Sequence, residues 1–417
     1  MKKLVVKKSS PLYGTITTSG SKNSALPIIA SALLSGEECV FKNIPNLEDI
    51  QTMLKLLKSF GVKNNFKNSE IKVNASNVNY YRADYELVRK MRASILVLGP
   101  LLARKRRAVV SLPGGCAIGT RPIDLHLFGM RKLGADIYIN NGYVVAEAKH
   151  GLVGNLIKLP FKSVGATENI LLGSAIAKGT TLIKNAAKEP EIEDLCNCLN
   201  KMGSKISGIG TSELKIEGVK NLSGVQYSII PDRIVAGTLI IAALITRGIL
   251  KITKIYPNHL DLPIRILKKM GADISIAKNH IVVNGKNSQL KSVDIVTEPY
   301  PGFPTDLQAQ FMSLLAIVKG NSSVQEKIFE NRFMHVGELN RLGANIKVNK
   351  DRALINGVDK LKGAEVMASD LRASVSLVLA GLMAQGETHI NRIYHLDRGY
   401  ENIEKKLNSC GAKIKRI

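Results

Sequence analysis

A sixfold internal repeat is the feature that most constrains how this chain folds. In each copy a helix-like run ends in a hydrophobic residue, and a glycine and a short alternating stretch follow. The six glycines are Gly61, Gly134, Gly203, Gly271, Gly343 and Gly411, at spacings of 73, 69, 68, 72 and 68 residues. A glycine in this place is typical of the left-handed residue that follows a helix. Because the period exceeds that of most solenoids, we predict α/β modules rather than an open array.

A second glycine recurs within the repeat, where a longer apolar helix ends and a strand begins. It occurs in five copies, as Gly36, Gly179, Gly248, Gly320 and Gly386. Most copies close with a hairpin pattern, such as residues 271–276 followed by 280–284. The module is therefore helix, strand, helix, strand, strand. The last copy ends one strand short, and we expect residues 3–7 to supply that strand.

A chain of 417 residues exceeds what one hydrophobic core usually serves, so we predict two domains of three modules each. The first would span residues 22–229. The second would combine residues 1–21 with 230–417, because the N-terminal strand completes the last module. The chain would then cross between the domains twice, near residues 20 and 230, and this double hinge would let them close.

Residues 113–124 form a glycine-rich stretch that contains Cys116. Three glycines and flanking prolines indicate a loop that leaves regular structure at defined points. A free cysteine is commonly just a small buried hydrophobe. Cys116 lacks the apolar neighbours of a core cysteine, so we favour a reactive thiol.

Several basic residues stand in distinctive stretches and could bind anions. Residues 19–23, Ser-Gly-Ser-Lys-Asn, resemble a phosphate loop that leads into a helix, although the spacing of a nucleotide-binding P-loop is absent. An ordinary helix cap with an exposed lysine is the alternative. Arginines stand in five such stretches, and their planar forks suit phosphate and carboxylate. These arginines are Arg92, Arg121, Arg332, Arg372 and Arg398.

Asp306 follows a proline-rich turn at residues 299–304 and stands at a predicted helix start. Two interpretations stay open, a helix N-cap and a general base. The sequence contains no zinc-ligand spacing and no dinucleotide fingerprint, so we expect neither a metal nor a cofactor.

The net charge is +25, which raises the question of an anionic partner. The lysines are scattered, without a basic stripe or interleaved aromatic residues, so we expect small anionic substrates and no nucleic acid. A basic nucleic-acid-binding repeat protein remains the alternative. The apolar runs are too short to span a bilayer, so we expect no membrane insertion. Five cysteines give no disulfide framework. We therefore expect a cytoplasmic protein.

Together, seven stretches resemble the UDP-N-acetylglucosamine 1-carboxyvinyltransferases, a family of enolpyruvyl transferases. The stretches are residues 19–23, 113–126, 163–167, 231–234, 303–306, 329–335 and 397–400. The resemblance implies a two-domain inside-out α/β barrel of six βαβαββ-like repeats, three per domain. It also implies transfer of the enolpyruvyl group of phosphoenolpyruvate to the 3′-hydroxyl of UDP-N-acetylglucosamine by addition and elimination, with release of phosphate. This reaction is the first committed step of peptidoglycan synthesis.

The resemblance further implies a role for each matching residue. The catalytic residues would be Cys116, Asp306, Lys22 and Arg398, with Cys116 as the general acid that fosfomycin-type epoxides alkylate. The residues that bind phosphoenolpyruvate would be Lys22, Asn23, Arg121, Arg332, Arg372 and Arg398. The residues that bind the UDP-sugar would be Asn23, Arg92, Arg121, Pro122, Ile123, Asp124, Leu125, Lys162, Ser163, Val164, Gly165, Asp306 and Ile328.

The chain departs from the family pattern at two positions. Val235 stands where members often carry an acidic residue, and Phe161 stands where many carry a lysine. The nearest alternative is 5-enolpyruvylshikimate-3-phosphate synthase, which shares the architecture and the donor. The cysteine loop and the Arg-Pro-Ile-Asp segment at 121–124 argue against that acceptor.

Overall fold

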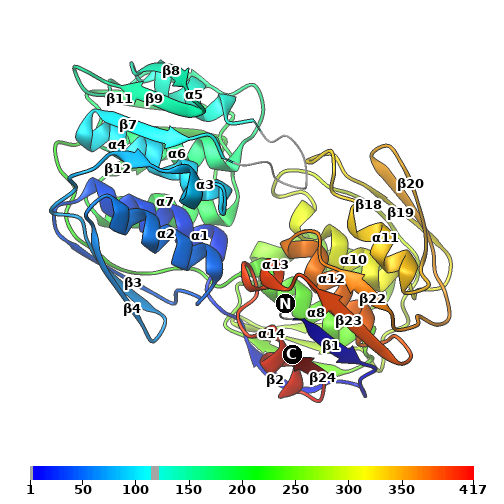
Figure 1. Ribbon diagram of the computed structural model, residues 1–417. Helices are drawn as coiled ribbons and strands as arrows, with labels where there is room; N and C mark the ends of the chain where they lie inside the picture. The colour runs from blue at the N-terminus through cyan, green and yellow to red at the C-terminus, as the bar shows by residue number, and fades with distance from the viewer. Residues whose placement is uncertain (1–2, 114–121) are drawn as a thin grey trace. The chain divides into compact units, whose positions relative to one another are not determined.

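The computed structural model describes residues 3–113 and 122–417, which form two compact units (Figure 1). Within the described residues, unit 1 comprises 3–19 and 231–417, and unit 2 comprises 20–113 and 122–230. Each unit has its own hydrophobic core. Cys116 and Arg121 lie outside the described residues.

Six four-stranded sheets make up the strands of the described residues, three in each unit. Unit 2 contains the sheets β14-β3-β5-β4, β6-β7-β9-β8 and β10-β11-β13-β12. Their strands are β3 (Glu38–Lys42), β4 (Lys63–Lys67), β5 (Glu70–Asn74), β6 (Arg82–Ala83), β7 (Arg107–Ser111), β8 (Asp136–Asn140), β9 (Tyr143–Glu147), β10 (Leu156–Lys158), β11 (Thr180–Lys184), β12 (Lys205–Ser207), β13 (Glu213–Glu217) and β14 (Gln226–Ser228).

Unit 1 contains the sheets β16-β17-β15-β2, β18-β19-β21-β20 and β22-β23-β1-β24. Their strands are β1 (Leu4–Lys7), β2 (Tyr13–Thr17), β15 (Ile249–Thr253), β16 (Asp273–Ile276), β17 (His280–Asn284), β18 (Asp294–Val296), β19 (Asn321–Gln325), β20 (Asn345–Asn349), β21 (Arg352–Asn356), β22 (Glu365–Met367), β23 (Glu387–Asn391) and β24 (Lys413–Arg416). Each sheet of the molecule has one parallel pair and two antiparallel pairs, so the same module is repeated six times.

Apolar helices occupy the centre of each unit, and the sheets lie around them. The helices of unit 2 are α1 (Lys22–Ser31), η1 (Ala32–Leu34), α2 (Glu48–Ser59), α3 (Tyr85–Val88), η2 (Arg92–Val97), α4 (Leu98–Lys105), α5 (Asp124–Lys132), α6 (Val164–Ser174) and α7 (Pro190–Lys201). Those of unit 1 are α8 (Arg233–Ile245), η3 (Pro257–Leu260), α9 (Asp261–Met270), η4 (Thr305–Leu307), α10 (Gln308–Leu315), α11 (His335–Arg341), α12 (Leu371–Gly381), α13 (Tyr394–Asp397) and α14 (Ile403–Asn408).

Helices α8, α10 and α12 pack against one another in unit 1, and nearly every residue in them is buried (Figure 1). In unit 2, helix α6 packs against α4 and also contacts α1. The second helix of a module buries one face only, as α9 does through Pro263, Ile264, Leu267 and Met270. Helices that are apolar all round belong in a core, whereas an amphipathic helix covers one. The two-unit α/β fold that the sequence predicted is confirmed, with helices inside and sheets outside.

The prediction that the N-terminal strand completes the last module is also confirmed. Strand β1 lies between β23 and β24 and pairs with both in antiparallel fashion, with Val6 opposite Thr388 and Ile414 (Figure 1). The six repeated glycines follow helices with φ between 90° and 104°, as a left-handed C-terminal residue requires. In the one module without the second glycine, Arg106 takes the left-handed conformation with φ 59° before β7.

Within the described residues the chain passes between the units at residues 19–20 and 230–231, and backbone hydrogen bonds tie these two segments together. The Ser21 N–H donates to the Ile230 carbonyl at 2.9 Å, and the Asp232 N–H donates to the Ser19 carbonyl at 2.8 Å. Asp232 also caps α8, because its Oδ1 accepts from the N–H groups of Ile234 and Val235. None of the helices in residues 3–113 and 122–417 is both long and apolar enough to cross a bilayer.

Candidate active site

Two buried arginines hold the Asp306 carboxylate in unit 1. The Nη2 of Arg332 lies 2.9 Å from Oδ1, and the Nη2 of Arg372 lies 2.8 Å from Oδ2. The arginine side chains are 5% and 2% exposed, whereas that of Asp306 is 26% exposed. Asp306 lies inside η4, whose N-cap is Pro304, so it is not a helix cap. The arrangement presents a partly exposed carboxylate backed by two fixed cations.

A buried hydrogen-bond network sets the position of Arg372. Its Nη1 donates to the hydroxyl of Tyr400 at 3.2 Å, and its guanidinium lies 5.5 Å from the centre of the same ring. Gln310 donates to that hydroxyl at 3.1 Å and to Thr238 at 3.2 Å. Burial alone would lower the pKa of Arg372, but the nearby charge of Asp306, with Tyr400 and Asp232, raises it above its ordinary value. Arg372 therefore stays a cation.

The turn that carries Arg398 lies at the N-terminus of α12, which also carries Arg372. Asp370 caps this helix by accepting from the Arg372 and Ala373 N–H groups at 2.7 and 3.1 Å. A side chain at Gly399 would collide with Leu371, so the turn that carries Arg398 packs directly on this helix start. Close approach of this kind needs glycine. Unit 1 thus brings together Asp306, Arg332 and Arg372, and the turn that carries Arg398 packs next to them.

Arg416 anchors the turn that precedes Arg398. Arg416 on β24 donates to both oxygens of Asp397 at 2.9 and 2.7 Å, and its Nε donates to Glu404 at 2.8 Å. These bonds, with Asp397 first, raise the pKa of Arg416. A two-pronged pair fixes orientation as well as distance. The end of the chain therefore holds the end of α13 in place.

Replacing Arg372 with methionine should destabilise the protein by about 2 kcal/mol, because it removes one of the two buried arginines that hold Asp306 and one hydrogen bond to the Tyr400 hydroxyl. Denaturant unfolding of both proteins measures the difference. Arg265→Met is the matched control, since it breaks an exposed Asp261–Arg265 pair at 2.8 Å and should cost less than about 1 kcal/mol. Equal unfolding midpoints for wild type and Arg372→Met would contradict the structural role.

His335 is buried beside the arginine cluster and should make stability depend on pH. Burial lowers its pKa from 6.5 to about 4, with Arg332 also lowering it and Asp370 opposing the shift. Its Nε2 has no hydrogen-bond partner in the described part of the chain. The unfolded chain therefore binds a proton below pH 6.5 that the folded protein binds only near pH 4.

We expect the free energy of unfolding to fall by about 3 kcal/mol from this group as the pH falls from 6.5 to 4. Denaturant unfolding at a series of pH values gives the free energy of unfolding. Its slope against pH should be shallower for His335→Gln than for wild type. His150→Gln, at an exposed histidine, should keep the wild-type slope. Parallel slopes for His335→Gln and wild type would show that His335 does not titrate in this way.

In unit 2, Lys22 and Asn23 begin α1. Ser21 is the N-cap, and its Oγ accepts from the Ser24 N–H at 3.3 Å. The helix-cap interpretation is correct for Ser21, but Lys22 is buried rather than exposed. Its Nζ lies 3.2 Å from Oδ2 of buried Asp49 on α2. The lysine is thus a fixed cation at the start of a helix.

The buried carboxyl group of Asp194 on α7 accepts hydrogen bonds at this helix start. It accepts from the hydroxyl of Ser24, from that of Tyr227 at 2.6 Å, and from the Ile230 N–H at 3.2 Å. Burial raises the pKa of Asp194, and the three hydrogen bonds partly offset this rise. One carboxyl group therefore joins α1 to the chain segment that leaves unit 2.

The other predicted residues of unit 2 gather where α5 and α6 begin. Arg92 donates to the Pro122 carbonyl at 3.1 Å, which places it beside residues 122–125. Ser163 caps α6 through the Ala166 N–H, and a Cβ at Gly165 would lie 3.0 Å from the ring of His126 on α5. Two adjacent helix N-termini with an arginine favour anionic groups.

The two departures from the family pattern have different surroundings. Val235 is buried in the core of unit 1 on α8. Phe161 is 59% exposed, and Lys162 next to it is half-buried. An apolar side chain is accommodated at position 235, and Lys162 stands next to the α6 cap.

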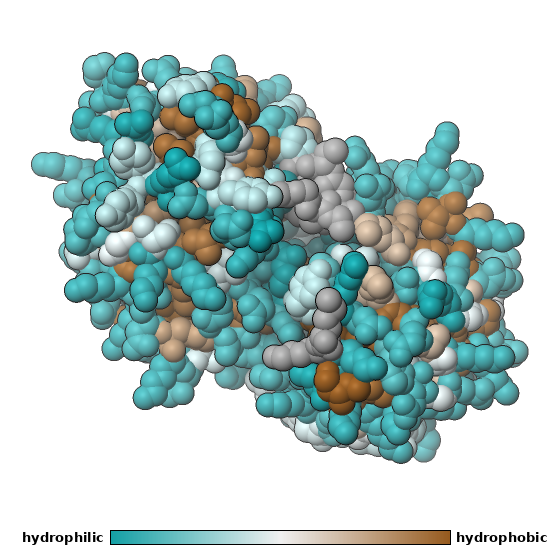
Figure 2. Space-filling model, in the orientation of Figure 1, coloured by the Kyte–Doolittle hydropathy of each residue, from teal (hydrophilic) through white to brown (hydrophobic). Residues whose placement is uncertain are grey.

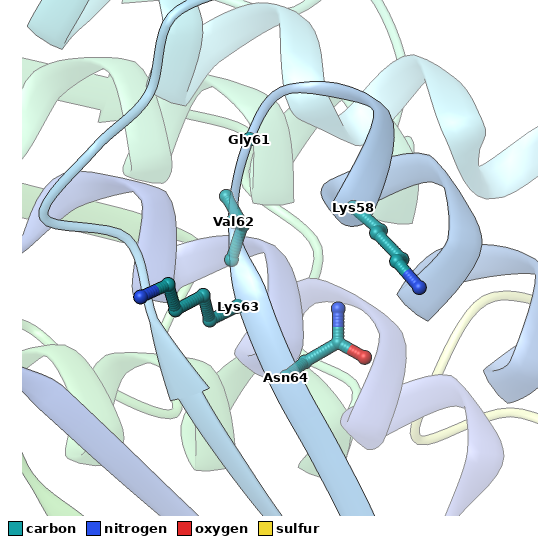
Figure 3. A pocket seen from close by; sticks show the side chains of 5 residues that line it. All are labelled: Lys58, Gly61, Val62, Lys63 and Asn64. Atoms are coloured by element: carbon teal, nitrogen blue, oxygen red, sulfur yellow. The ribbon is translucent and has the colours of Figure 1, made fainter.

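One hollow on unit 2 lies apart from these residues. Lys58, Gly61, Val62, Lys63 and Asn64 line it, where α2 ends and β4 begins (Figure 3). It includes none of the predicted site residues, and Asn64 is already engaged with the Leu54 carbonyl at 3.0 Å. The visible surface is mostly hydrophilic with scattered apolar residues (Figure 2). The described residues contain no cluster of His, Cys, Asp and Glu that could hold a metal.

The structure divides the predicted residues into two sets. Asp306, Ile328, Arg332, Arg372 and Arg398 belong to unit 1, and the other described ones belong to unit 2. No functional role was predicted for Asp49, Asp370, His335 or Tyr400. A buried carboxylate at the start of amphipathic α2 or before α12 looks like an ordinary helix start in sequence. The matching stretches 329–335 and 397–400 offered a signal for His335 and Tyr400 only.

Comparison with known proteins defines the class first. The model of the EPSP synthase (3-phosphoshikimate 1-carboxyvinyltransferase) family matches residues 6–407. The enolpyruvyl transferase NikO from Streptomyces tendae has the same fold, with a TM-score of 0.90, 24% identity, and coverage of 100% of this chain and 98% of NikO. EPSP synthase from Acinetobacter baumannii follows with a TM-score of 0.77, 21% identity and full coverage of both chains. The fold is that of the enolpyruvyl transferases.

Curated relatives give the particular family. A UDP-N-acetylglucosamine 1-carboxyvinyltransferase 1 from Caldanaerobacter subterraneus subsp. tengcongensis is 54% identical over 99% of both chains. Relatives named UDP-N-acetylglucosamine 1-carboxyvinyltransferase from Pelagibacter ubique and Shewanella frigidimarina are 54% and 50% identical over the full length of both chains. The chain belongs to the UDP-N-acetylglucosamine 1-carboxyvinyltransferase family of enolpyruvyl transferases.

Proposed function

We propose that this protein transfers the enolpyruvyl group of phosphoenolpyruvate to the 3′-hydroxyl of UDP-N-acetylglucosamine and releases phosphate, in the cytoplasm, as the first committed step of peptidoglycan synthesis. The observation that carries the chemistry is the Asp306 carboxylate held between two buried guanidiniums. Full-length identity of 50–54% with relatives of that name supports the acceptor. We assign residues 22–229 to one domain, and 1–21 with 230–417 to the other.

The reaction needs two proton transfers in its addition step. Asp306 would remove the proton of the sugar 3′-hydroxyl as its oxygen bonds to C2 of phosphoenolpyruvate, and Cys116 would protonate the methylene carbon C3. In the elimination step the bond from C2 to the phosphate oxygen breaks, and C3 loses a proton to restore the double bond. General acid and base groups each contribute about 10²- to 10⁴-fold in rate.

Fixed cations would stabilise the anionic tetrahedral intermediate. Arg332, Arg372 and Arg398 would supply them from unit 1, and Lys22 would supply one next to Asn23 and near buried Asp49. Cations already held in place need no reorganisation as charge develops, which makes them effective. Arg121 would complete the set of residues that bind phosphoenolpyruvate.

The UDP-sugar would contact the start of α5 and α6. Arg92 with Pro122, and Ser163 to Gly165 with Lys162, would face its diphosphate and uridine. Asn23, Asp306 and Ile328 would contact the sugar. The helix N-termini supply N–H donors for phosphate oxygens.

Phosphate release with phosphoenolpyruvate and each acceptor tests the proposal. We expect release with UDP-N-acetylglucosamine and none with shikimate 3-phosphate. The family model carries the name of the shikimate enzyme, so the second acceptor is the direct rival. Release with shikimate 3-phosphate alone would overturn the assignment.

A further inference from the structure

Glu326, which follows β19, joins the two segments that carry predicted acceptor contacts in unit 1. One segment contains Thr305 and Asp306, and the other contains Ile328. We infer that Glu326 is a positioning residue that sets Asp306 and the Ile328 backbone relative to one another. This inference rests on the proposed function, in which both residues contact the UDP-sugar.

Four hydrogen bonds converge on the Glu326 carboxylate. Its Oε1 accepts from the Thr297 hydroxyl at 2.9 Å and from the backbone N–H groups of Ile328 at 2.9 Å and Phe329 at 3.2 Å. Its Oε2 accepts from the Thr305 hydroxyl at 2.8 Å. The residue is only 4% exposed. The two oxygens thus hold three separate parts of the chain.

Thr297, just after β18, completes the network. Its hydroxyl donates to Glu326 and accepts from the Lys327 N–H at 2.9 Å. Three successive N–H groups, from residues 327 to 329, are therefore held by one buried carboxylate and one buried hydroxyl. A buried carboxylate is tolerated when it is fully hydrogen-bonded, and it then rigidifies the groups around it.

The network fixes Asp306 from two directions. Thr305 precedes Asp306 and is held through Oε2 of Glu326, whereas Arg332 lies six residues after Glu326 and holds the Asp306 carboxylate itself. If Glu326 is lost, the turn loses its tie to residue 326 through Thr305, and the side-chain pair of Arg332 and Asp306 must hold the turn without it. A displacement of about 1 Å of a reacting group can cost about 10²-fold in rate.

Three variants separate the contributions. Glu326→Ala removes all four bonds. Glu326→Gln is the conservative rescue, because its amide oxygen can accept the bonds of Oε1 and its amide nitrogen can donate to Thr305. Thr305→Val removes only the bond to the Asp306 segment. Ser323→Ala is the control, since it removes a similar hydroxyl-to-carboxylate bond, 2.8 Å to Asp294, elsewhere in the same sheet.

We expect Glu326→Ala to lower kcat/KM for UDP-N-acetylglucosamine by about 10- to 100-fold, with a smaller change in KM for phosphoenolpyruvate. Thr305→Val should lower kcat and leave KM for the UDP-sugar within about twofold, since the Ile328 bonds remain. Glu326→Gln and Ser323→Ala should stay within about threefold of wild type. Hydrogen exchange at the Ile328 and Phe329 amides should be about tenfold faster in Glu326→Ala alone.

These outcomes separate the inference from the proposed function. Wild-type protein that releases no phosphate with UDP-N-acetylglucosamine refutes the function, and the positioning role falls with it. An active wild type whose Glu326→Ala and Thr305→Val variants keep wild-type kinetics refutes the positioning role alone. If Glu326→Ala does not fold, Thr305→Val decides: unchanged kcat overturns the inference, and reduced kcat with unchanged KM supports it.

Discussion

Replacing Asp306 with asparagine should lower kcat by about 10²- to 10⁴-fold, the range expected for loss of a general base. Asparagine has nearly the same shape and keeps an oxygen toward one arginine, but its amide cannot take a proton. Arg332 and Arg372 would remain buried and would still be positively charged. The loss should therefore fall on turnover much more than on KM for the UDP-sugar.

Steady-state kinetics with both substrates, and denaturant unfolding, measure this prediction. Asp261→Asn is the matched control, because it also removes the charge of an aspartate paired with an arginine at 2.8 Å, but at an exposed place on α9. It should leave kcat unchanged. An Asp306→Asn variant with raised KM and normal kcat would make Asp306 a binding group and remove it as the base.

Replacing Cys116 with alanine should lower turnover by a similar factor of about 10²- to 10⁴-fold and abolish labelling by a fosfomycin-type epoxide. Cys116 lies outside the described residues, so this prediction rests on the sequence resemblance and the proposed function. Alanine has no proton to deliver to the methylene carbon and no sulfur to alkylate. Mass spectrometry of the intact protein after epoxide treatment gives the labelling directly.

The other four cysteines are the internal controls for labelling. Cys39, Cys196, Cys198 and Cys410 are all buried. Burial raises the pKa of Cys39 to about 11 and that of Cys196 to about 12, so little thiolate is present at neutral pH. Wild type should take up one label and Cys39→Ala should also take up one. One label on Cys116→Ala would show that the reactive thiol lies elsewhere.

Much of the fold could be predicted because its signals are local. A helix that ends in a left-handed glycine and continues into an alternating strand depends on a few consecutive residues, and the chain shows this signal six times. The strand contributed by residues 4–7 followed from a count, since the last module lacked one strand. Local signals of this kind survive in a sequence because they do not depend on what packs against them.

The candidate site could be predicted only in part. The resemblance named Asp306, Arg332 and Arg372, but the residues alone left Asp306 open between a helix cap and a base. The structure excludes the cap, because Pro304 is the N-cap of η4, and it brings Arg332 and Arg372 to the carboxylate from 26 and 66 residues away. Nothing in the sequence distinguished Glu326, because a lone glutamate after a strand looks like an ordinary surface residue.

The amino-acid sequence by itself determined the repeated module, the number of modules, the place of the N-terminal strand in the last module, and the family. Only the tertiary structure decided which charges meet: Lys22 with Asp49, Asp306 with its two arginines, and Glu326 with its four donors. The physical reason is the separation along the chain between the residues that interact. Helix ends and strand alternation come from neighbouring residues, whereas a buried charge depends on partners that the folded chain brings from far away.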